Sequence, residues 1–460
     1  MNHRSVARPV TLFSTVLVAI AVGCATSDDN LRILGVDPGE KPPALAPPDT
    51  NQDASTPTEN TNACDSCPAS SFCENGVCRC PVSQNTICAN ACVDLQSDDA
   101  NCGTCGHLCG PPVDGGIGPV CLAGVCRTAE TFPLSLYRST VLFGDDQALY
   151  VFGRSEKYYA IERAEKSQHP TFTRLVDLTW MNSDNEPTAA IVAGDDVYFG
   201  YPVGVFRLPK TGGDVHQISQ QAAFAFAATA THLYVGGPGG ISRMTLPDGP
   251  FEPFLDFSAG HLAIRGNDLY VAKSTYPPIT PVDIVHVDLT TKIATLIGTT
   301  IRVTGLAPLD DGVIWSSGMF YSAPDVYGEH RLLRWTKSPA KTSVLFQNSY
   351  SPVTGVATNG SNIYFTNGYY WSFEQNANAL VMLHLGPADD ARAVPLATAL
   401  QQRTQLTPSP AEGRIIVEHM SWPVVDDHFV YWLDEVEPES VNGNPELVQG
   451  RTNVRRIAIK

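Results

Sequence analysis

The chain has 460 residues, of which 43% are hydrophobic, and its formal net charge at pH 7 is −17. This length and hydrophobic content suffice to bury a large core in one or more domains. The acidic balance argues against binding to a nucleic-acid backbone, which requires clustered Lys and Arg, and against docking on anionic lipid through surface charge alone. We therefore expect no nucleic acid among the partners of this chain.

Residues 1–24 have the features of an export signal. His3, Arg4 and Arg8 form a positively charged end, and Val10 to Val22 is an apolar run interrupted only by hydroxyl residues. The run is too short for a typical membrane-spanning helix and has the length of the apolar region of a signal peptide. The sequence therefore predicts export from the cytoplasm.

The end of this segment resembles the bacterial lipobox, because small residues precede Cys24, although Ala21 stands where Leu is commoner. The resemblance implies that Cys24 is lipidated and becomes the N-terminus of the mature protein. The alternative is ordinary signal-peptidase cleavage with Cys24 incidental. The cysteine count favours lipidation, because removing Cys24 from thirteen leaves twelve that can pair completely. Ala25 follows where some bacteria place Asp for inner-membrane retention, which favours the outer membrane or cell surface.

Residues 25–63 are predicted to form a disordered linker. The stretch from Pro42 to Pro48 is rich in proline, and the residues after it are mainly Asn, Thr, Asp and Pro. Such a composition offers little apolar surface to bury and favours an extended, solvated tether. A folded arm is the alternative.

Residues 64–127 are predicted to form a small disulfide-rich module. It holds twelve of the thirteen cysteines, and none follows it. They are Cys64, Cys67, Cys73, Cys78, Cys80, Cys88, Cys92, Cys102, Cys105, Cys109, Cys121 and Cys126. This density is typical of exported modules too small to build an apolar core, so we expect six disulfides. The Cys-x-x-Cys pairs at Cys64 and Cys102 leave a zinc site as the alternative.

The second half of this module, Cys88 to Cys126, resembles the small cysteine-rich repeats of the stigma-specific-protein type, which also occur in bacterial surface lipoproteins. The stretch from Asn101 to Cys105 is the most specific part of the match. The resemblance implies a disulfide-stapled extracytoplasmic module and implies no activity.

Residues 128–460 carry a motif of an aliphatic residue, usually Tyr, and then an aromatic residue or Val. Its seven copies are Leu149-Tyr150-Val151, Val197-Tyr198-Phe199, Leu233-Tyr234-Val235, Leu269-Tyr270-Val271, Val313-Ile314-Trp315, Ile363-Tyr364-Phe365 and Val430-Tyr431-Trp432. Each copy follows a short polar turn. A period of roughly 40–50 residues with several strands per period is typical of a β-propeller. The sequence therefore predicts an all-β fold, with a seven-bladed β-propeller after the linker and the disulfide-rich module.

The last repeat predicts how the ring closes. Its second strand is expected at Phe429 to Leu433 and its third at Asn453 to Lys460, after which no residues remain for an outer strand. A blade without its outer strand would leave an unpaired edge. A spare β-compatible stretch, Thr128 to Leu136, precedes the first repeat. We predict that Glu130 to Leu134 pairs with Val454 to Ile459 as the outer strand of the last blade.

Two sets of aromatic residues are candidates for ligand binding. The tyrosines of the motif would either pack between blades or form a ring of ligand-stacking side chains. The second set is a predicted loop with four large aromatic side chains, Tyr369, Tyr370, Trp371 and Phe373. Exposed together, they would form a contact surface for a protein or carbohydrate ligand. The alternative is a loop folded over a blade edge.

No motif selects a metal, a cofactor or a catalytic residue. The histidines are scattered without ligand spacing, and the chain has no calcium-binding loop, nucleophile elbow or phosphate-binding loop. We therefore expect no cofactor and no metal. The alternative is a lyase or metal-dependent hydrolase that uses the axial tunnel, with His261, Asn359, Glu418 and His419 as the side chains that would converge there.

The tyrosine motifs also resemble, loosely, those of YWTD-like and NHL-like propellers, which implies a binding or scaffolding role. Our main hypothesis is a lipid-anchored extracytoplasmic protein, attached to the outer membrane or cell surface, that presents its propeller at the cell envelope. The alternatives are the tunnel enzyme and a purely structural envelope component.

Overall fold

The computed structural model describes residues 67–68, 71–75, 77–81, 86–110, 118–136, 138–155, 158–181, 187–273, 281–318, 330–348, 353–367, 379–385, 393–398, 418–436 and 451–460. All of them belong to Thr61–Lys460, the second of the two units into which the chain divides. Within this described part, no helix has the length and hydropathy needed to cross a bilayer. The predicted lipidation site Cys24, the linker 25–63 and Cys64 lie outside the described residues.

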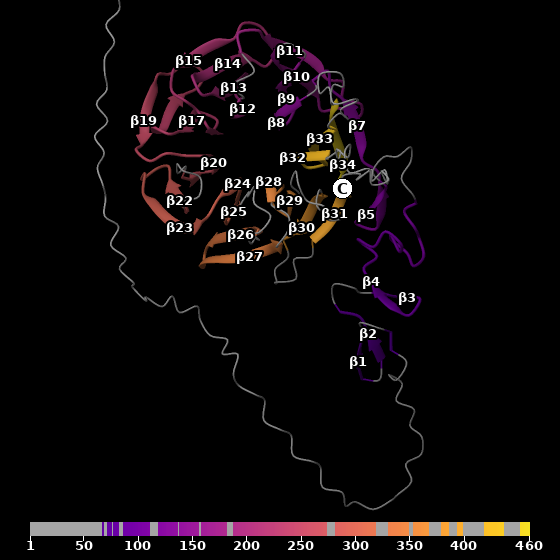
Figure 1. Ribbon diagram of the computed structural model, residues 1–460. Helices are drawn as coiled ribbons and strands as arrows, with labels where there is room; N and C mark the ends of the chain where they lie inside the picture. The colour runs from indigo at the N-terminus through magenta and orange to yellow at the C-terminus, as the bar shows by residue number, and fades with distance from the viewer. Residues whose placement is uncertain are drawn as a thin grey trace, which may run out of the picture. The chain divides into compact units, whose positions relative to one another are not determined.

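Seven four-stranded antiparallel sheets form a β-propeller, with the first strand of each blade nearest the axis and the fourth at the perimeter (Figure 1). Blades 1 to 3 are β8 (Arg138–Gly144), β9 (Ala148–Arg154), β10 (Tyr159–Glu165), β11 (Thr173–Leu178); β12 (Ala189–Ala193), β13 (Asp196–Tyr201), β14 (Gly204–Pro209), β15 (His216–Ser219); and β16 (Ala225–Ala228), β17 (His232–Gly237), β18 (Gly240–Thr245), β19 (Phe251–Leu255). The predicted all-β, seven-bladed architecture is confirmed.

Blades 4 to 6 continue the same order. They are β20 (His261–Arg265), β21 (Asp268–Ala272), β22 (Val282–Asp288), β23 (Ala294–Thr300); β24 (Val303–Leu309), β25 (Gly312–Ser317), β26 (His330–Lys337), β27 (Ala340–Asn348); and β28 (Val353–Thr358), β29 (Asn362–Asn367), β30 (Ala379–His384), β31 (Ala393–Thr398). Blade 7 is made of β32 (Glu418–Val425), β33 (Phe429–Val436), β34 (Arg451–Ala458) and β7 (Glu130–Pro133).

The repeated motif forms the second strand of every blade and lies in the core. Five motif tyrosines are at most 1% exposed, and Tyr234 is 3% exposed. The hydroxyl of Tyr198 donates to the carbonyl of Pro247 in the next blade, at 3.4 Å. These tyrosines therefore pack between blades and do not form a ring of exposed ligand-stacking side chains. In five blades the central motif residue pairs with an arginine of the third strand: Arg163, Arg207, Arg243, Arg334 and Arg456.

Six outer strands share a one-residue β-bulge for which the sequence carries no local signal. The register between third and fourth strands shifts at the same step in blades 1 to 6. The extra residue is always large and apolar: Leu175, Ile218, Phe254, Ile297, Leu345 or Leu396. The first five of these pack against the core clusters of their blades. In these five blades the bulge thus turns one outer-strand side chain inward, and a bulge also strengthens the local twist.

Strand β7 closes the ring as predicted. It pairs antiparallel with β34, with Pro133 opposite Asn453 and Glu130 opposite Arg456. Phe132 is 9% exposed and joins a core cluster that spans blades 7 and 1. Pro133 fits this place because an outermost strand tolerates a residue without an N–H.

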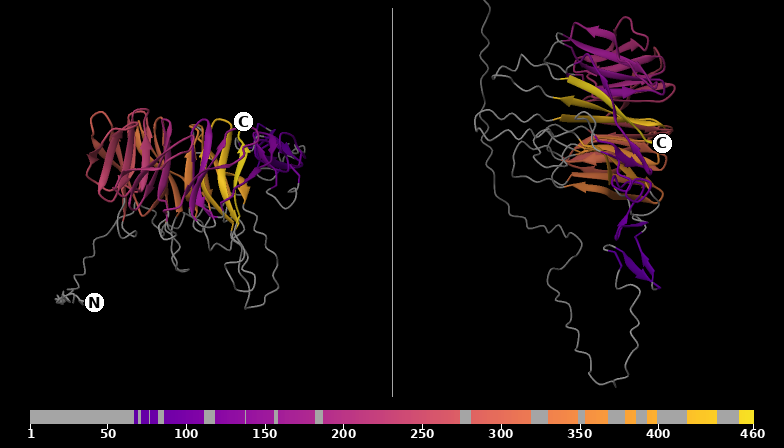
Figure 2. Two further views of the ribbon diagram at one scale, coloured as in Figure 1. Left: turned by 90° about the horizontal axis from the view of Figure 1, so that it is seen from above. Right: turned by 90° about the vertical axis from the view of Figure 1, so that its right-hand side faces the viewer.

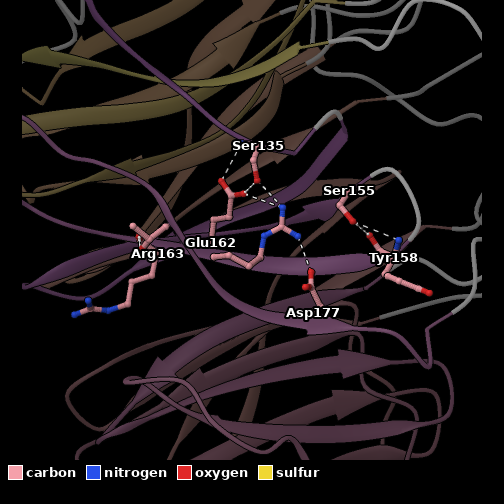
Figure 3. Close-up of polar contacts among 8 residues, drawn as sticks. Ser135, Ser155, Tyr158, Glu162, Arg163 and Asp177 are labelled. Atoms are coloured by element: carbon pink, nitrogen blue, oxygen red, sulfur yellow. Dashed lines mark hydrogen bonds and ion pairs between the residues drawn. The ribbon is translucent and has the colours of Figure 1, made fainter.

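The chain that leads from β7 into blade 1 is fixed by a buried carboxylate (Figure 3). Glu162 on β10 is 1% exposed and accepts hydrogen bonds from the amide and the hydroxyl of Ser135. Arg174 on β11 forms an ion pair with Glu162 at 3.2 Å and another with Asp177 at 2.7 Å. A buried charge requires such partners, and here they tie the β7–β8 connection to blade 1.

The disulfide-rich region consists of three short hairpins: β1 (Phe72–Glu74) with β2 (Val77–Arg79), β3 (Thr86–Cys88) with β4 (Ala91–Val93), and β5 (Val120–Leu122) with β6 (Val125–Arg127). Its described disulfides are Cys67–Cys78, Cys80–Cys92, Cys88–Cys105, Cys102–Cys121 and Cys109–Cys126, and Cys73 is also disulfide-bonded. Leu122 of the last hairpin packs with Tyr364 and Trp432 at the seam of blades 6 and 7. This hairpin is therefore part of the propeller's core packing.

Candidate functional site

The two faces of the propeller differ in the length of their connections. Because the strands of a blade alternate in direction, the first-to-second and third-to-fourth connections share one face, which we name the short-turn face (Figure 2). Its first-to-second turns have two or three residues, and none of its connections exceeds eight. The opposite, long-connection face carries the connections 318–329, 368–378, 399–417 and 437–450. Sequence that does not build the blades is thus concentrated on one face.

The turns of the short-turn face are fixed by local hydrogen bonds. Asp145 and Asp426 each accept, through Oδ1, the amides two and three residues further on. Their Oδ2 atoms bind a lysine of the following blade, Lys210 at 2.5 Å and Lys166 at 3.0 Å. Burial opposes ionisation of both carboxyls. The lysines and the turn amides outweigh it, so the pKa of each lies below its usual value. These carboxylates are already engaged.

The long-connection face carries exposed aromatic and aliphatic side chains among its described residues. Trp180, just after β11, is 48% exposed, while its ring packs on Phe206 with centroids 4.6 Å apart. Val203, in the β13–β14 turn, is 55% exposed, and Tyr158, in the β9–β10 turn, is 39% exposed. An aromatic ring that is held by a neighbour yet half open to solvent is a ready contact point for a ligand.

The predicted binding residues Tyr369, Tyr370, Trp371 and Phe373 belong to the connection between β29 and β30. That connection starts and ends on the long-connection face. The four residues themselves lie outside the described residues, so their role stays a prediction. The sequence does not single out Trp180, because a lone Trp after a strand carries no local signal of exposure.

A cavity of about 320 Å³ lies on the propeller axis, with walls from the first-strand regions of all seven blades. Three of its lining side chains are polar, Thr188, His261 and Thr304. Each donates to a main-chain carbonyl of the next blade: Thr188 to Ala223, His261 Nε2 to Val303 at 2.9 Å, and Thr304 to Val353. These three hydrogen bonds link neighbouring blades around the axis.

His261 is neutral at pH 7. Its Nε2 contacts a carbonyl oxygen, which only accepts, so this nitrogen carries the proton. Burial is the main cause that lowers the pKa of His261 to about 4. The ring therefore acts as a hydrogen-bond donor between blades 4 and 5.

Of the other tunnel residues named from the sequence, Asn359 has a described side chain, and it does not line the axial cavity. None of the described residues that line the axial cavity is a carboxylate. Asn359 lies in the turn after β28, where its Oδ1 accepts the amides of Ser361 and Asn362. The side chains of Glu418 and His419 lie outside the described residues. No described geometry at the axis therefore favours the enzymatic alternative.

A second cavity, of about 860 Å³, lies between blades 7 and 1 and is lined by acidic and basic side chains. Arg456, 2% exposed, donates from this wall to the carbonyls of Ser167, at 2.5 Å, and Gln168, and pairs with Glu130 at 2.8 Å. Its guanidinium also lies over the rings of Phe132 and Phe429. The polar groups of this cavity hold the closing seam together.

One cluster of potential metal ligands occurs within the described part of the chain. The sulfurs of Cys102, Cys109 and Cys126 lie within 4.8 Å of one another. Each belongs to a disulfide, with Cys121, Cys126 and Cys109 respectively. A disulfide sulfur is not the thiolate that zinc requires. Cys102 and Cys105, whose spacing raised the zinc alternative, are in two different disulfides.

No family model and no curated protein matches the chain. Similar solved structures include the extracellular domain of a hybrid two-component system from B. thetaiotaomicron, with 10% identity over 71% of this chain and 39% of that chain and a TM-score of 0.47. The WD40 domain of Toxoplasma gondii coronin has 10% identity over 73% and 87%, with a TM-score of 0.45. PorZ, a bacterial surface component of the type-IX secretion system of Porphyromonas gingivalis, has 11% identity over 69% and 45%, with a TM-score of 0.34. These similarities identify neither a family nor a ligand.

Proposed function

We propose that this chain is a lipid-anchored extracytoplasmic binding protein that presents the long-connection face of its propeller to a protein or carbohydrate ligand. The observation that supports this is the segregation of long connections onto one face of a rigid ring. Binding residues tend to lie on loops that a rigid scaffold positions. The turns of the opposite face are short and internally bonded, which suits a supporting role.

The compartment follows from the disulfides. Five complete disulfides are described in a module of short hairpins. Disulfides form and persist in oxidising compartments, so the module belongs outside the cytoplasm. The lipid anchor at Cys24 and its attachment to the outer membrane or cell surface rest on the sequence.

The anchor is tested by substitution and mass. Cys24→Ser is expected to release the protein from membranes, because a lipidated N-terminus holds a soluble domain at the bilayer through its acyl chains. The mature wild-type protein should partition into detergent and carry an acyl-modified N-terminus. An intact mass with an unmodified Cys24, or with a different first residue, would contradict the anchor.

The binding face is tested by shortening one connection on each face of the same blade. In the first variant, 368–378 is replaced by Pro-Gly, the sequence of the two-residue turn between β17 and β18. In the control, the connection between β30 and β31 on the short-turn face is cut to two residues. A glycan array and immobilised outer-membrane proteins serve as probes.

The first variant, and separately Trp180→Ala, should reduce binding to a probe at least about tenfold, the usual cost of losing an aromatic anchor. The control should bind as the wild type does. Equal losses on both faces, or unchanged binding in the first variant, would refute the assignment of the binding face.

A further inference from the structure

The axial cavity has the size and the lining of a small-molecule site. Its volume, about 320 Å³, lies at the lower end of the range of ligand pockets. Its wall is mostly apolar, with Leu142, Phe226 and Leu262 among its side chains, and none of the described residues that line it carries a charge at pH 7. A cavity with a few polar groups on an apolar wall is a preferred place for a ligand to bind.

The cavity lies toward the long-connection face in blades 2 to 4. The first strands surround the axis (Figure 1), and they begin at the long-connection face because their turns into the second strands lie on the short-turn face. In these three blades the lining residues are 188–190, 224–226 and 260–262. They are the first residues of β12, β16 and β20 or directly precede them.

Four consecutive blades have an irregular first strand at the level of the cavity. The pairing of first and second strands shifts register in blades 5, 6, 7 and 1, whereas it is regular in blades 2, 3 and 4. The cavity wall includes a residue from each shift: Gly305, Gly355, Pro423 and Val141. Bulges occur preferentially at sheet edges and next to active sites. Every first strand is an edge strand, so edge position alone does not account for the shifts.

The polar side chains of the wall can only accept a further hydrogen bond. Thr188 and Thr304 already donate their hydroxyl protons to carbonyls, and His261 donates through Nε2. The neutral ring leaves Nδ1 of His261 without a proton, and this nitrogen has no hydrogen-bond partner among the described residues. It is also accessible, unlike the enclosed Nδ1 of His330. An occupant of the cavity therefore meets a free acceptor.

We propose that the axial cavity binds a small neutral molecule with an apolar body and an N–H or O–H group, which donates to Nδ1 of His261. A neutral ligand fits, because a charged one would lose its hydration without gaining a counter-charge from the described wall. The donor fits, because an acceptor left unpaired beside an apolar occupant costs free energy. Phenol and indole represent this class, since each combines one donor with an aromatic body suited to the rings of Phe224 and Phe226.

The experiment uses the full-length chain, with phenol and indole as probes and with anisole and 1-methylindole as matched compounds that lack the donor. Ligand-observed NMR titrations measure the affinities. His261→Gln keeps a donor for Val303 but has no acceptor in the place of Nδ1. Ala190→Leu fills part of the cavity, because Ala190 is half-buried and lines it. The controls His232→Gln and Ala228→Leu make the same changes at described positions outside the cavity. Cooperative unfolding verifies that each variant is folded.

Phenol and indole should bind at least about tenfold more tightly than anisole and 1-methylindole, the ratio expected for one hydrogen bond in an apolar site. His261→Gln should remove this preference and Ala190→Leu should abolish binding, while both controls behave as the wild type does. The proposal is overturned by equal binding of the paired compounds, by a preference that survives His261→Gln, or by binding that survives Ala190→Leu. Tighter binding of benzoate or benzylammonium, or no saturable binding of phenol and indole, would overturn it as well. None of these results bears on the long-connection face, whose probes and variants are separate.

Discussion

The seam between blades 7 and 1 and the seams between consecutive blades are held by different means. Between blades 1 and 2 the described polar bond on the short-turn face is the pair of Lys210 with Asp145. The closing seam has the equivalent pair, Lys166 with Asp426, and in addition the buried groups Arg456 and Glu162. Blade 7 joins the two ends of the domain, so its pairing bears the entropy cost of closing a very long loop. The closing seam thus has two buried charged side chains, Arg456 and Glu162, where that cost must be offset.

Arg456→Ala should weaken the closing seam more than any other single substitution considered below. Arg456 bonds to Ser167, Gln168 and Glu130, and only 2% of it is exposed. Its removal should lower the free energy of unfolding by about 3–5 kcal/mol, because two carbonyls and the stacked phenylalanines lose a buried partner. Chemical denaturation measures the change.

Arg243→Ala is the matched control for Arg456, since both arginines pair with the central tyrosine of their blade's motif. The side chain of Arg243 is 28% exposed, and its ion-pair partner Glu252 is 61% exposed. We expect a loss of about 1 kcal/mol or less, as for exposed ion pairs. Equal losses at the two positions would mean that the closing seam is no more dependent on its polar contacts than an internal blade.

Low pH should selectively weaken the seam between blades 4 and 5, where His261 donates to Val303. The folded-state pKa of His261 is about 4, below the usual 6.5, so the folded protein excludes a proton that the unfolded chain binds. Its contribution is fully present above pH 6.5 and is lost as the pH falls towards 4. The loss should be on the order of 2 kcal/mol, because each tenfold change in proton affinity corresponds to about 1.4 kcal/mol and the cavity gives the ring some access to solvent.

His261→Gln tests this origin of the pH dependence. The Gln side-chain amide can still donate to Val303 but does not titrate, so unfolding curves between pH 4 and 6.5 should become flatter. Below pH 4 the engaged carboxyls Asp145, Asp268 and Asp426 add a further loss, because their pKa values are lowered in the folded state. An unchanged slope between pH 4 and 6.5 would show that His261 does not control this range.

These contrasts also mark what sequence alone predicts. The seven motifs predict the blades because each second strand is fully buried, and burial of a strand leaves a local apolar pattern. The closing strand is predictable by counting strands, since the last repeat lacks one. The sequence does not predict the bulges or the contacts of Arg456, Lys166 and Lys210. These contacts become visible only once strands from different repeats are placed in register. The proposed binding face follows from topology, while Trp180 requires its exposure to be seen.

A smaller effect separates Glu162 from an exposed counterpart. Glu162→Gln keeps the size of the side chain and a hydrogen bond to Ser135 but removes the charge that pairs with Arg174. We expect a loss of about 1–2 kcal/mol in the free energy of unfolding, because Arg174 retains Asp177 as a partner. The equivalent change at Glu252, whose side chain is 61% exposed, should lower the free energy of unfolding by only about a few tenths of a kcal/mol. A larger loss at Glu252 would contradict a special role for the β7–β8 connection.

The smallest expected effect compares the two lysine pairs that occur in both kinds of seam. Lys166→Met and Lys210→Met remove equivalent side chains, since the amides of both lysines donate to the residue that precedes the second strand of their blade. The side chain of Lys166 is 10% exposed and lies over the ring of Tyr431, whereas that of Lys210 is 22% exposed. Each change should cost about 1 kcal/mol or less, with the greater loss at Lys166 because its charge is more enclosed. The double variant decides whether the seams are coupled. If closing the ring makes them act together, the double loss will exceed the sum of the single losses, whereas additive losses would show that each pair serves only its own seam.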